Sequence, residues 1–281
     1  MQDYIALRIN ADPCNETVTD LLAAFLCDVG FESFSADESG MTAYVRYDLY
    51  DENNVKEILS DFPMETKLDF SAETVHGEDW NEEWEKNYFK PIIVDGRCVV
   101  HSSFHKDIPV AEYDIVIDPK MAFGTGHHST TGNMMRFILS EDMKGKNVID
   151  MGTGTGILSI LCKMRGADKV TGIEIDPFAW ENAVENVRLN GVAVDMICGD
   201  ASTLEGLYTA DYFLANINRN VITSDVDKYA RKIKVGGIML LSGFYRSDIP
   251  VVLQSTEKFG FTHVDTLEEN DWVAIKLVKN A

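Results

Sequence analysis

Residues 147–157 limit the possible folds of this chain more than any other stretch. They read Asn-Val-Ile-Asp-Met-Gly-Thr-Gly-Thr-Gly-Ile, so a short apolar run leads into three alternate glycines, Gly152, Gly154 and Gly156, and then into an apolar, helix-like segment. Glycine allows a sharp turn from strand to helix and lets another molecule approach the backbone. In an open α/β sheet, nucleotide-like ligands bind at this end of a strand. The stretch therefore predicts a buried strand, a ligand-binding turn and a helix.

Strand-like and helix-like segments alternate from residue 146 to the end of the chain, which predicts a mainly parallel sheet with helices on both faces. The expected strands cover residues 148–151, 169–175, 195–198, 210–215, 237–242, 261–267 and 272–278, and the expected helices lie near 157–165, 178–189, 219–233 and 247–258. The last two strands are joined only by residues 268–271, so they must form an antiparallel hairpin. A seven-stranded, Rossmann-like α/β sheet that ends in such a hairpin is typical of class I methyltransferases.

A smaller α+β unit is expected before this sheet. Strand patterns cover residues 3–10, 31–36, 41–49 and 64–70, and amphipathic helix patterns cover residues 15–30 and 51–61. The resulting order, βαββαβ, is that of a ferredoxin-like domain. Because this stretch has no His/Cys cluster and no glycine loop, we interpret it as a binding module.

The chain carries a formal net charge of -21, and an acidic surface repels phosphates, so free nucleic acid is a poor candidate partner. Residues 1–70 carry 15 acidic and 4 basic side chains, a net of -11, which is about half of the excess in a quarter of the chain. This asymmetry indicates that the first unit meets a basic protein; the alternative is that acidity only maintains solubility. No apolar run is long enough to span a membrane and no signal peptide is recognisable, so we expect a cytoplasmic protein.

The glycine turn departs from the dinucleotide pattern Gly-x-Gly-x-x-Gly, because Ile157 stands where the third glycine would be. Three polar residues at successive strand ends indicate adenosine with a non-phosphate tail instead. Glu174 suits the two hydroxyls of a ribose, Asp200 suits the amino group of an adenine, and Asn216 offers a carbonyl and an amide at the mouth of the site. S-adenosylmethionine is therefore the expected cofactor. The alternative for Glu174 and Asp200 is that each only caps a helix.

The stretch 118–131 carries a more specific pattern. It reads Asp-Pro-Lys-Met-Ala-Phe-Gly-Thr-Gly-His-His-Ser-Thr-Thr and resembles the signature Asp-Pro-Gly-Leu-Ala-Phe-Gly-Thr-Gly-Thr-His-Pro-Thr-Thr of bacterial methyltransferases of ribosomal large-subunit protein eleven. The resemblance continues through the glycine turn and covers roughly the whole chain. By position it implies cofactor contacts at Thr131, Gly152, Glu174 and Asn216, to which the pattern above adds Gly154 and Asp200.

The resemblance implies a protein N-methyltransferase that transfers methyl groups from S-adenosylmethionine to α-amino and lysine ε-amino groups of ribosomal protein eleven, free or on the ribosome. No dedicated base is recognisable, so we assign the orientation of the amine, as the catalytic role, to Asn216. No metal is expected, because His127 and His128 lack a carboxylate or cysteine at ligand spacing. We expect neither a membrane nor sequence-specific nucleic acid as a partner.

The predicted division of the chain is a ferredoxin-like substrate-recognition domain at residues 1–66, a linker with a helix at 67–90 and the methyltransferase domain at 91–281. Trp80, Trp84 and Tyr88, at a spacing of four, mark one face of the linker helix. Two other functions stay open. One is N-methylation of a nucleobase or of another translation protein, whose enzymes typically carry Asn-Pro-Pro-Tyr where this chain has Asn-Ile-Asn-Arg at 216–219. The other is a non-catalytic protein that binds S-adenosylmethionine.

Overall fold

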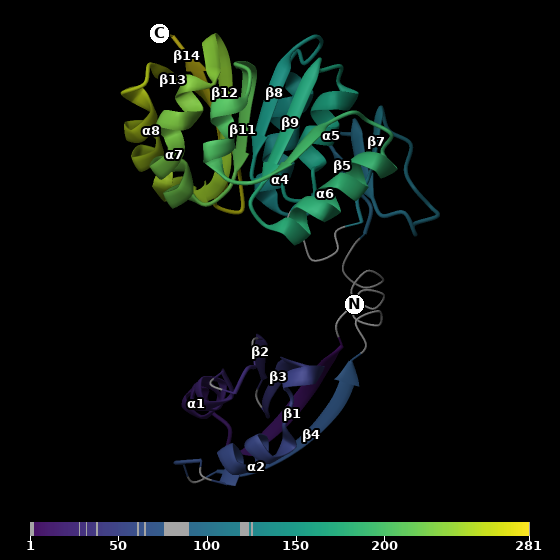
Figure 1. Cartoon of the computed structure of the whole chain (residues 1–281), viewed down its shortest axis with the longest axis vertical. Coiled ribbons are helices and arrows are strands. Elements are labelled where there is room, and N and C mark those ends of the chain that lie inside the picture. The colour runs from purple at the N-terminus through teal and green to yellow at the C-terminus, as the bar shows by residue number, and fades with distance from the viewer. Residues whose placement is uncertain are drawn as a thin grey trace. The chain divides into compact units, whose positions relative to one another are not determined.

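The computed structural model describes residues 3–27, 29–31, 33–37, 39–60, 62–64, 66–75, 90–118, 124 and 126–280. The chain divides into two compact units, Met1–Tyr88 and Phe89–Ala281, which are considered separately (Figure 1). The linker helix predicted around Trp80, Trp84 and Tyr88 lies outside the described residues.

The first unit is a four-stranded antiparallel sheet with two helices. Its elements are β1 (Tyr4–Asp12), α1 (Glu16–Cys27), β2 (Ser33–Asp37), β3 (Gly40–Arg46), the 3-10 turn η1 (Tyr47–Leu49), α2 (Glu52–Ser60) and β4 (Lys67–Val75). The strand order is β2-β3-β1-β4. Alternate residues of β1, namely Ile5, Leu7 and Ile9, are buried against Leu22 of α1 and its neighbours, because successive strand side chains point to opposite faces. The element order is therefore the βαββαβ order expected from the sequence.

The predicted end of the first domain at residue 66 is wrong, because a whole strand of its sheet follows that position. Strand β4 pairs with β1 along its full length, from Asp12 opposite Lys67 to Tyr4 opposite Val75. It is an edge strand whose second half is exposed, so Ser71 and the residues after it lack the apolar alternation that marks a strand in a sequence. The first sheet ends at Val75.

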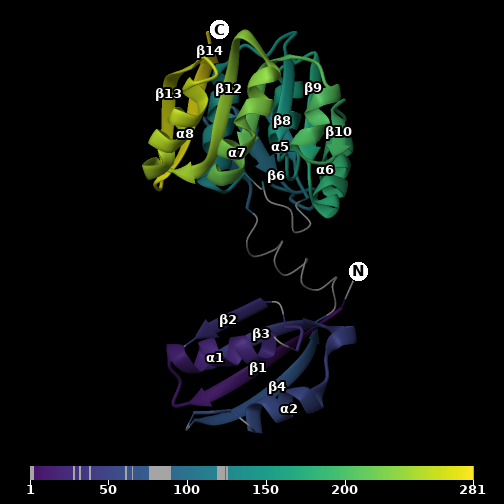
Figure 2. The ribbon, with the colours of Figure 1, turned by 60° about the vertical axis from the view of Figure 1, so that its left-hand side comes forward.

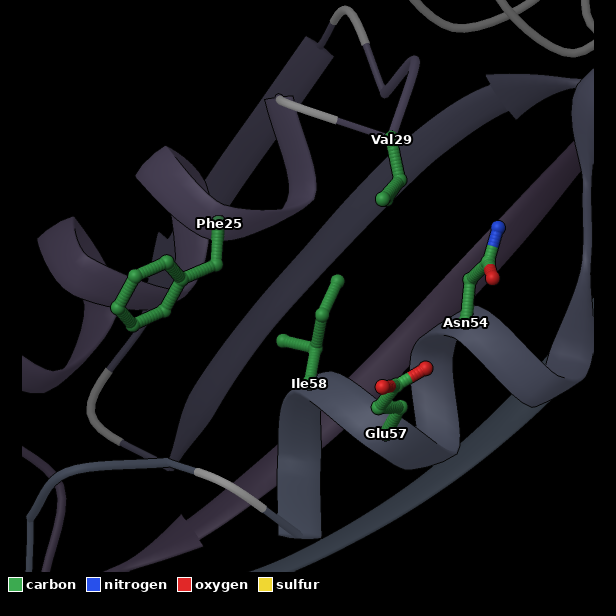
Figure 3. Close-up of a pocket in the computed structure, with 5 residues that line it drawn as sticks. All are labelled: Phe25, Val29, Asn54, Glu57 and Ile58. Atoms are coloured by element: carbon green, nitrogen blue, oxygen red, sulfur yellow. The ribbon is translucent and has the colours of Figure 1, made fainter.

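The helical face of the first unit contains a pocket of about 360 Å³ between α1 and α2. Figure 3 shows its lining: Phe25 and Val29 on one side, and Asn54, Glu57 and Ile58 on the other. Phe25 is 36% exposed, although a second ring, that of Phe62, packs edge-on against its ring with centroids 6.2 Å apart. The pocket thus combines apolar walls with one carboxylate and one amide.

The second unit contains a small sheet and a large one. The small sheet has the order β5-β6-β7 and the large one the order β10-β9-β8-β11-β12-β14-β13. The elements are β5 (Ile92–Val94), β6 (Cys98–His101), β7 (Tyr113–Val116), α4 (Ser129–Ser140), β8 (Asn147–Met151), α5 (Ile157–Met164), β9 (Lys169–Glu174), α6 (Pro177–Leu189), β10 (Asp195–Cys198), η2 (Ala201–Gly206), β11 (Ala210–Asn216), α7 (Arg219–Arg231), β12 (Ile233–Tyr245), η3 (Arg246–Asp248), α8 (Ile249–Glu257), β13 (Phe261–Glu269) and β14 (Trp272–Lys279).

The large sheet is parallel from β10 to β12, and β14 runs antiparallel to both of its neighbours. Both faces are covered. Val148 packs with helices α4 and α5 on one face, whereas the next residue, Ile149, packs with α7 and α8 on the other. Figures 1 and 2 show α7 and α8 side by side over one face of this sheet. The strand order reverses between β8 and β11, and this reversal creates the crevice in which open α/β sheets bind ligands.

Strand β12 is longer than expected, running from residue 233 to 245 instead of 237 to 242. Its pairing with β14 shifts register between Ser242 and Phe244, because Gly243 has a left-handed backbone with φ +95°. The glycine hides the continuation of the strand in the sequence, since glycine usually weakens or ends one. Among the described residues, no helix is both long and apolar enough to cross a membrane.

Candidate functional site

The glycine turn joins β8 to α5 as predicted. Gly152, Gly154 and Gly156 have φ values of +70°, +56° and +83°, in the left-handed region that favours glycine. A Cβ atom at Gly152 would lie 2.2 Å from Cγ2 of Ile217, so that position has no room for a side chain. Gly156 precedes the first turn of α5 without a side-chain cap, which leaves backbone amides at this helix start available to a ligand. The turn therefore offers a ligand bare backbone.

Asp150 lies buried beneath the turn and is not among the site residues predicted from the sequence. Its Oδ2 accepts hydrogen bonds from the hydroxyls of Thr153 and Ser159, both at 2.7 Å, while its Oδ1 is buried without a hydrogen-bond partner in the described part of the chain. Burial raises the pKa of Asp150 from 3.8 to about 6, against the opposing effect of the two hydroxyls. An acidic residue at the end of an apolar strand was the signal that would have identified it.

Glu174 ends β9 and reaches the glycine turn. Its Oε2 accepts a hydrogen bond from the backbone amide of Gly154 at 2.9 Å, and its Oε1 accepts from the amides of Ile175 and Asp176 at 2.9 and 3.1 Å. The residue that caps α6 is Asp176, which accepts from the amide of Phe178 at 3.0 Å. The helix-cap alternative for Glu174 is thus wrong, and the structure brings this carboxylate to the glycines.

Asp200 is placed differently. It follows β10, is exposed, and caps the 3-10 helix η2 by accepting a hydrogen bond from the amide of Ser202 at 2.8 Å. The hydrogen bonds from Ser202 lower the pKa of the carboxyl. Its loop does lie beside Glu174, because the amide of Gly199 donates to the Glu174 carbonyl at 2.8 Å. The contacts of Asp200 therefore agree with the helix-cap alternative, because its carboxylate accepts from its own loop and not from the glycine turn.

Asn216 and Thr131 meet at the next strand end. Asn216 Nδ2 donates to Thr131 Oγ1 at 3.3 Å, which joins the end of β11 to the first turn of α4 across 85 residues of sequence. Thr131 is fully buried, and Asn216 Oδ1 is buried without a hydrogen-bond partner among the described residues. A buried carbonyl oxygen without a donor is costly and calls for an explanation, such as a catalytic role. Asn216 Oδ1 is therefore an unused hydrogen-bond acceptor at this strand end.

The residue after Asn216 is held from two sides by glycines. Ile217 contacts Gly152 as described, and its carbonyl oxygen would lie 2.3 Å from a Cβ atom placed on Gly243 of β12. The amide of Ile217 donates to the Ser242 carbonyl at 3.1 Å. The position of the Asn216 backbone is consequently fixed by close packing against the glycine turn and the β12 bulge.

The loop at 118–131 borders the same edge, although residues 119–123 and 125 lie outside the described part. Thr155 Oγ1, within the glycine turn, donates to the Gly124 carbonyl at 2.6 Å. The Nδ1 atom of His128 accepts from the amide of Thr130 at 3.3 Å and so caps α4, and His127 Nε2 lies 2.8 Å from the Lys90 carbonyl. Within the described ranges, no group of three His, Cys, Asp or Glu side chains is arranged to hold a metal ion.

Comparison with known proteins identifies relatives along nearly the whole chain. A family model described as ribosomal protein L11 methyltransferase (PrmA) matches residues 18–280. The ribosomal protein L11 methyltransferase of Bacteroides fragilis is 46% identical over 277 residues, covering 98% of this chain and 99% of the relative. That of Bacteroides thetaiotaomicron is 46% identical over 275 residues, covering 97% and 98%.

A solved structure shares the fold. The ribosomal protein L11 methylase of Lactobacillus delbrueckii subsp. bulgaricus superposes with a TM-score of 0.64 at 23% identity, over 69% of this chain and 100% of that one. The chain belongs to the ribosomal protein L11 methyltransferase family.

Proposed function

We propose that this protein methylates amino groups of ribosomal protein L11, both the α-amino group and lysine ε-amino groups, with S-adenosylmethionine as the methyl donor. The observation that carries the proposal is the meeting of three strand ends: the bare glycine turn after β8, Glu174 after β9, and Asn216 beside Thr131 after β11. The full-length relatives are named ribosomal protein L11 methyltransferases, which supports the acceptor protein and the type of transfer.

The residues at this edge fit S-adenosylmethionine. Glu174 holds a carboxylate against the turn, where two ribose hydroxyls can donate to it, and the amides at the start of α5 suit the carboxylate of a methionine tail. We assign Asp200 to the adenine end of the cofactor, because its loop lies beside Glu174, where the amide of Gly199 donates to the Glu174 carbonyl. The bound cofactor supplies a methyl group made electrophilic by a sulfonium.

The chain must present the amine in its neutral form. At pH 7, deprotonating a lysine costs about 4–5 kcal/mol and an α-amino group about 1 kcal/mol, given pKa values of ~10.4 and ~7.7. A water-poor site lowers either pKa because burial disfavours the charged form. Asn216 Oδ1, buried and without a partner among the described residues, is placed to accept an N–H of the amine and aim its lone pair. Orientation of this kind supplies a large part of the rate in bimolecular transfers.

The first unit is the proposed recognition domain, with a ferredoxin-like fold that ends at Val75 instead of residue 66. Its net charge of -11 over residues 1–70 suits a basic ribosomal protein. The pocket between α1 and α2 adds apolar walls and Glu57 on the same unit, so it is a candidate contact for an apolar side chain flanked by a basic one (Figure 3).

The test is transfer of a labelled methyl group from S-adenosylmethionine to purified ribosomal protein L11, with the modified residues located by mass spectrometry. We expect label on the α-amino group and on lysines. Free RNA, a second ribosomal protein and a nucleobase serve as alternative acceptors. Label on one of these and none on ribosomal protein L11 would show that the substrate is wrong, and no transfer together with tight cofactor binding would favour a non-catalytic protein.

A further inference from the structure

Three aromatic side chains from distant parts of the sequence gather beside the Asn216–Thr131 contact. The ring centroids of Tyr245 and Trp272 are 4.1 Å apart with an interplanar angle of 33°, and those of His128 and Trp272 are 4.8 Å apart at 68°. We call His128, Tyr245 and Trp272 the aromatic cluster. The rings come from the start of α4, the end of β12 and the start of β14, and Tyr245 is 49% exposed.

The aromatic cluster is built into the same sheet edge as the proposed amine site. His128 caps the helix whose first turn contains Thr131. Asn216 pairs with Ser242 on the adjacent strand, and Ser242 Oγ donates to the carbonyl of Val273, next to Trp272, at 2.7 Å. Because Ser242 pairs with Ala274 on β14, two strand spacings, roughly 10 Å, separate the backbones of Asn216 and Ala274, and Trp272 lies two residues further along, roughly 12 Å from Asn216.

Hydrogen bonds hold the aromatic cluster in place. Asn133 Nδ2 donates to the Trp272 carbonyl at 3.4 Å, and Asn270 Nδ2, in the turn before β14, donates to Ser129 Oγ at 3.1 Å. The amide of Tyr245 donates to Asp248 Oδ2 at 3.2 Å. These hydrogen bonds hold the backbone at or beside each of the three aromatic residues.

The charges around the aromatic cluster also suit a cation. The nearby arginines are each paired with a carboxylate: Arg246 with Glu268 at 2.5 Å, Arg219 with Asp248 at 2.7 Å, and Arg136 with Glu269 at 3.0 Å. The backbone turn before Trp272 carries the exposed carboxylate of Asp271. An ammonium group approaching the rings therefore meets no unpaired positive charge among these residues.

We propose that the aromatic cluster binds the alkylammonium group of the acceptor, and its methylated forms above all, next to Asn216. This inference rests on the proposed methylation of amines. Each methyl group makes an ammonium larger and less hydrated, and aromatic faces are the surfaces on which proteins bind such cations. A surface that retains the mono- and dimethylated ammonium between transfers keeps it near Asn216 until it loses its proton and the neutral amine reacts again, so the cluster promotes complete methylation.

The experiment compares wild-type protein with Tyr245→Leu, which removes an exposed ring, and with Tyr245→Phe, which keeps the ring and removes only the hydroxyl. Purified ribosomal protein L11 is the acceptor, and mass spectrometry gives the mono-, di- and trimethyl fractions at each site. We expect Tyr245→Leu to lower the trimethyl-to-monomethyl ratio about five-fold, with an unchanged dissociation constant for S-adenosylmethionine, and Tyr245→Phe to behave as wild type. Trp272→Leu, checked for folding by its melting temperature, is expected to have the larger effect.

Three results would overturn the inference. The first is an unchanged product ratio in both leucine variants. The second is a matching loss of cofactor affinity, which would assign the rings to the cofactor. The third is a trimethyl-to-monomethyl ratio that falls as far in Tyr245→Phe as in Tyr245→Leu, which would assign the effect to the hydroxyl. Failure of the wild-type protein to methylate the acceptor would refute the proposed function as well, and the wild-type reaction alone distinguishes that case.

Discussion

Replacing Asn216 with alanine should separate catalysis from folding. The substitution removes one hydrogen bond to Thr131, which at 3.3 Å is long and contributes about 1 kcal/mol at most. It also removes Oδ1, a buried oxygen without a partner in the described chain, whose burial costs about 1–3 kcal/mol. Because the two effects have opposite signs and the second is at least as large as the first, we expect no loss of stability and a gain of up to about 2 kcal/mol in the free energy of unfolding.

The effect on turnover should be much larger. If Oδ1 orients the amine, its loss misplaces the nucleophile, and a misplacement of this kind costs about 100-fold in rate, or about 3 kcal/mol of activation free energy. The assay is kcat for methyl transfer to ribosomal protein L11 at saturating cofactor, with cofactor affinity measured separately by calorimetry and stability by urea denaturation. Asn216→Asp is the matched variant: it keeps an oxygen at the same place but holds an ammonium in its charged form, so it too should be slow. Unchanged kcat in Asn216→Ala, or a loss explained wholly by unfolding or by weaker cofactor binding, would refute the role.

Three further tests concern the turn, the buried carboxylate and the first unit. Gly152→Ala should weaken cofactor binding and lower the melting temperature, since its Cβ would lie 2.2 Å from Ile217. The control is Gly191→Ala, which has a similar φ of +62° and no atom within 4 Å, so it should bring backbone strain only; equal effects of the two substitutions would contradict the clash. Because the pKa of Asp150 is raised from 3.8 to about 6, this carboxyl favours the folded state below pH 4, and that contribution, about 3 kcal/mol, is lost as the pH rises from 4 to 6. The denaturation midpoint of Asp150→Asn should therefore not fall with pH over this range as that of the wild type does, and equal pH dependence in both proteins would argue against the shift. Removing residues 1–75 should abolish methylation of ribosomal protein L11 while calorimetry still detects S-adenosylmethionine binding, and loss of that binding would contradict the division of roles.

The strands and helices of the large sheet were predictable because their patterns are local. Val148 and Ile149 face opposite sides of the sheet, and three alternate glycines after an apolar run indicate a strand-to-helix turn, so both the strand and the turn were evident in the sequence. The end of the first sheet was not, because β4 is held by backbone pairing with β1 rather than by buried side chains. A polar edge strand leaves almost no periodic signal.

Within the site, the sequence identified groups but not their partners. Glu174 and Asp200 follow strands in the same way, yet one carboxylate reaches the glycine turn and the other caps its own loop. That difference depends on loop geometry, which spacing does not encode. The aromatic cluster was equally hidden, because His128 and Trp272 are far apart in sequence and meet only once the β13–β14 hairpin lies against α4.

Ile217 gives the amine site an unusual kind of rigidity. It is wedged between Gly152 and Gly243, two positions where any larger residue would collide with it. The two contacts differ in kind, because Gly152 faces the Ile217 side chain and Gly243 faces the Ile217 backbone. A smaller residue at 217 would therefore make room for a methyl group at Gly152 but not at Gly243, so only the 152–217 pair should be strongly non-additive. The backbone that follows Asn216 is consequently held in place by close packing on both sides, so the position of the amide at the strand end does not depend on hydrogen bonds alone.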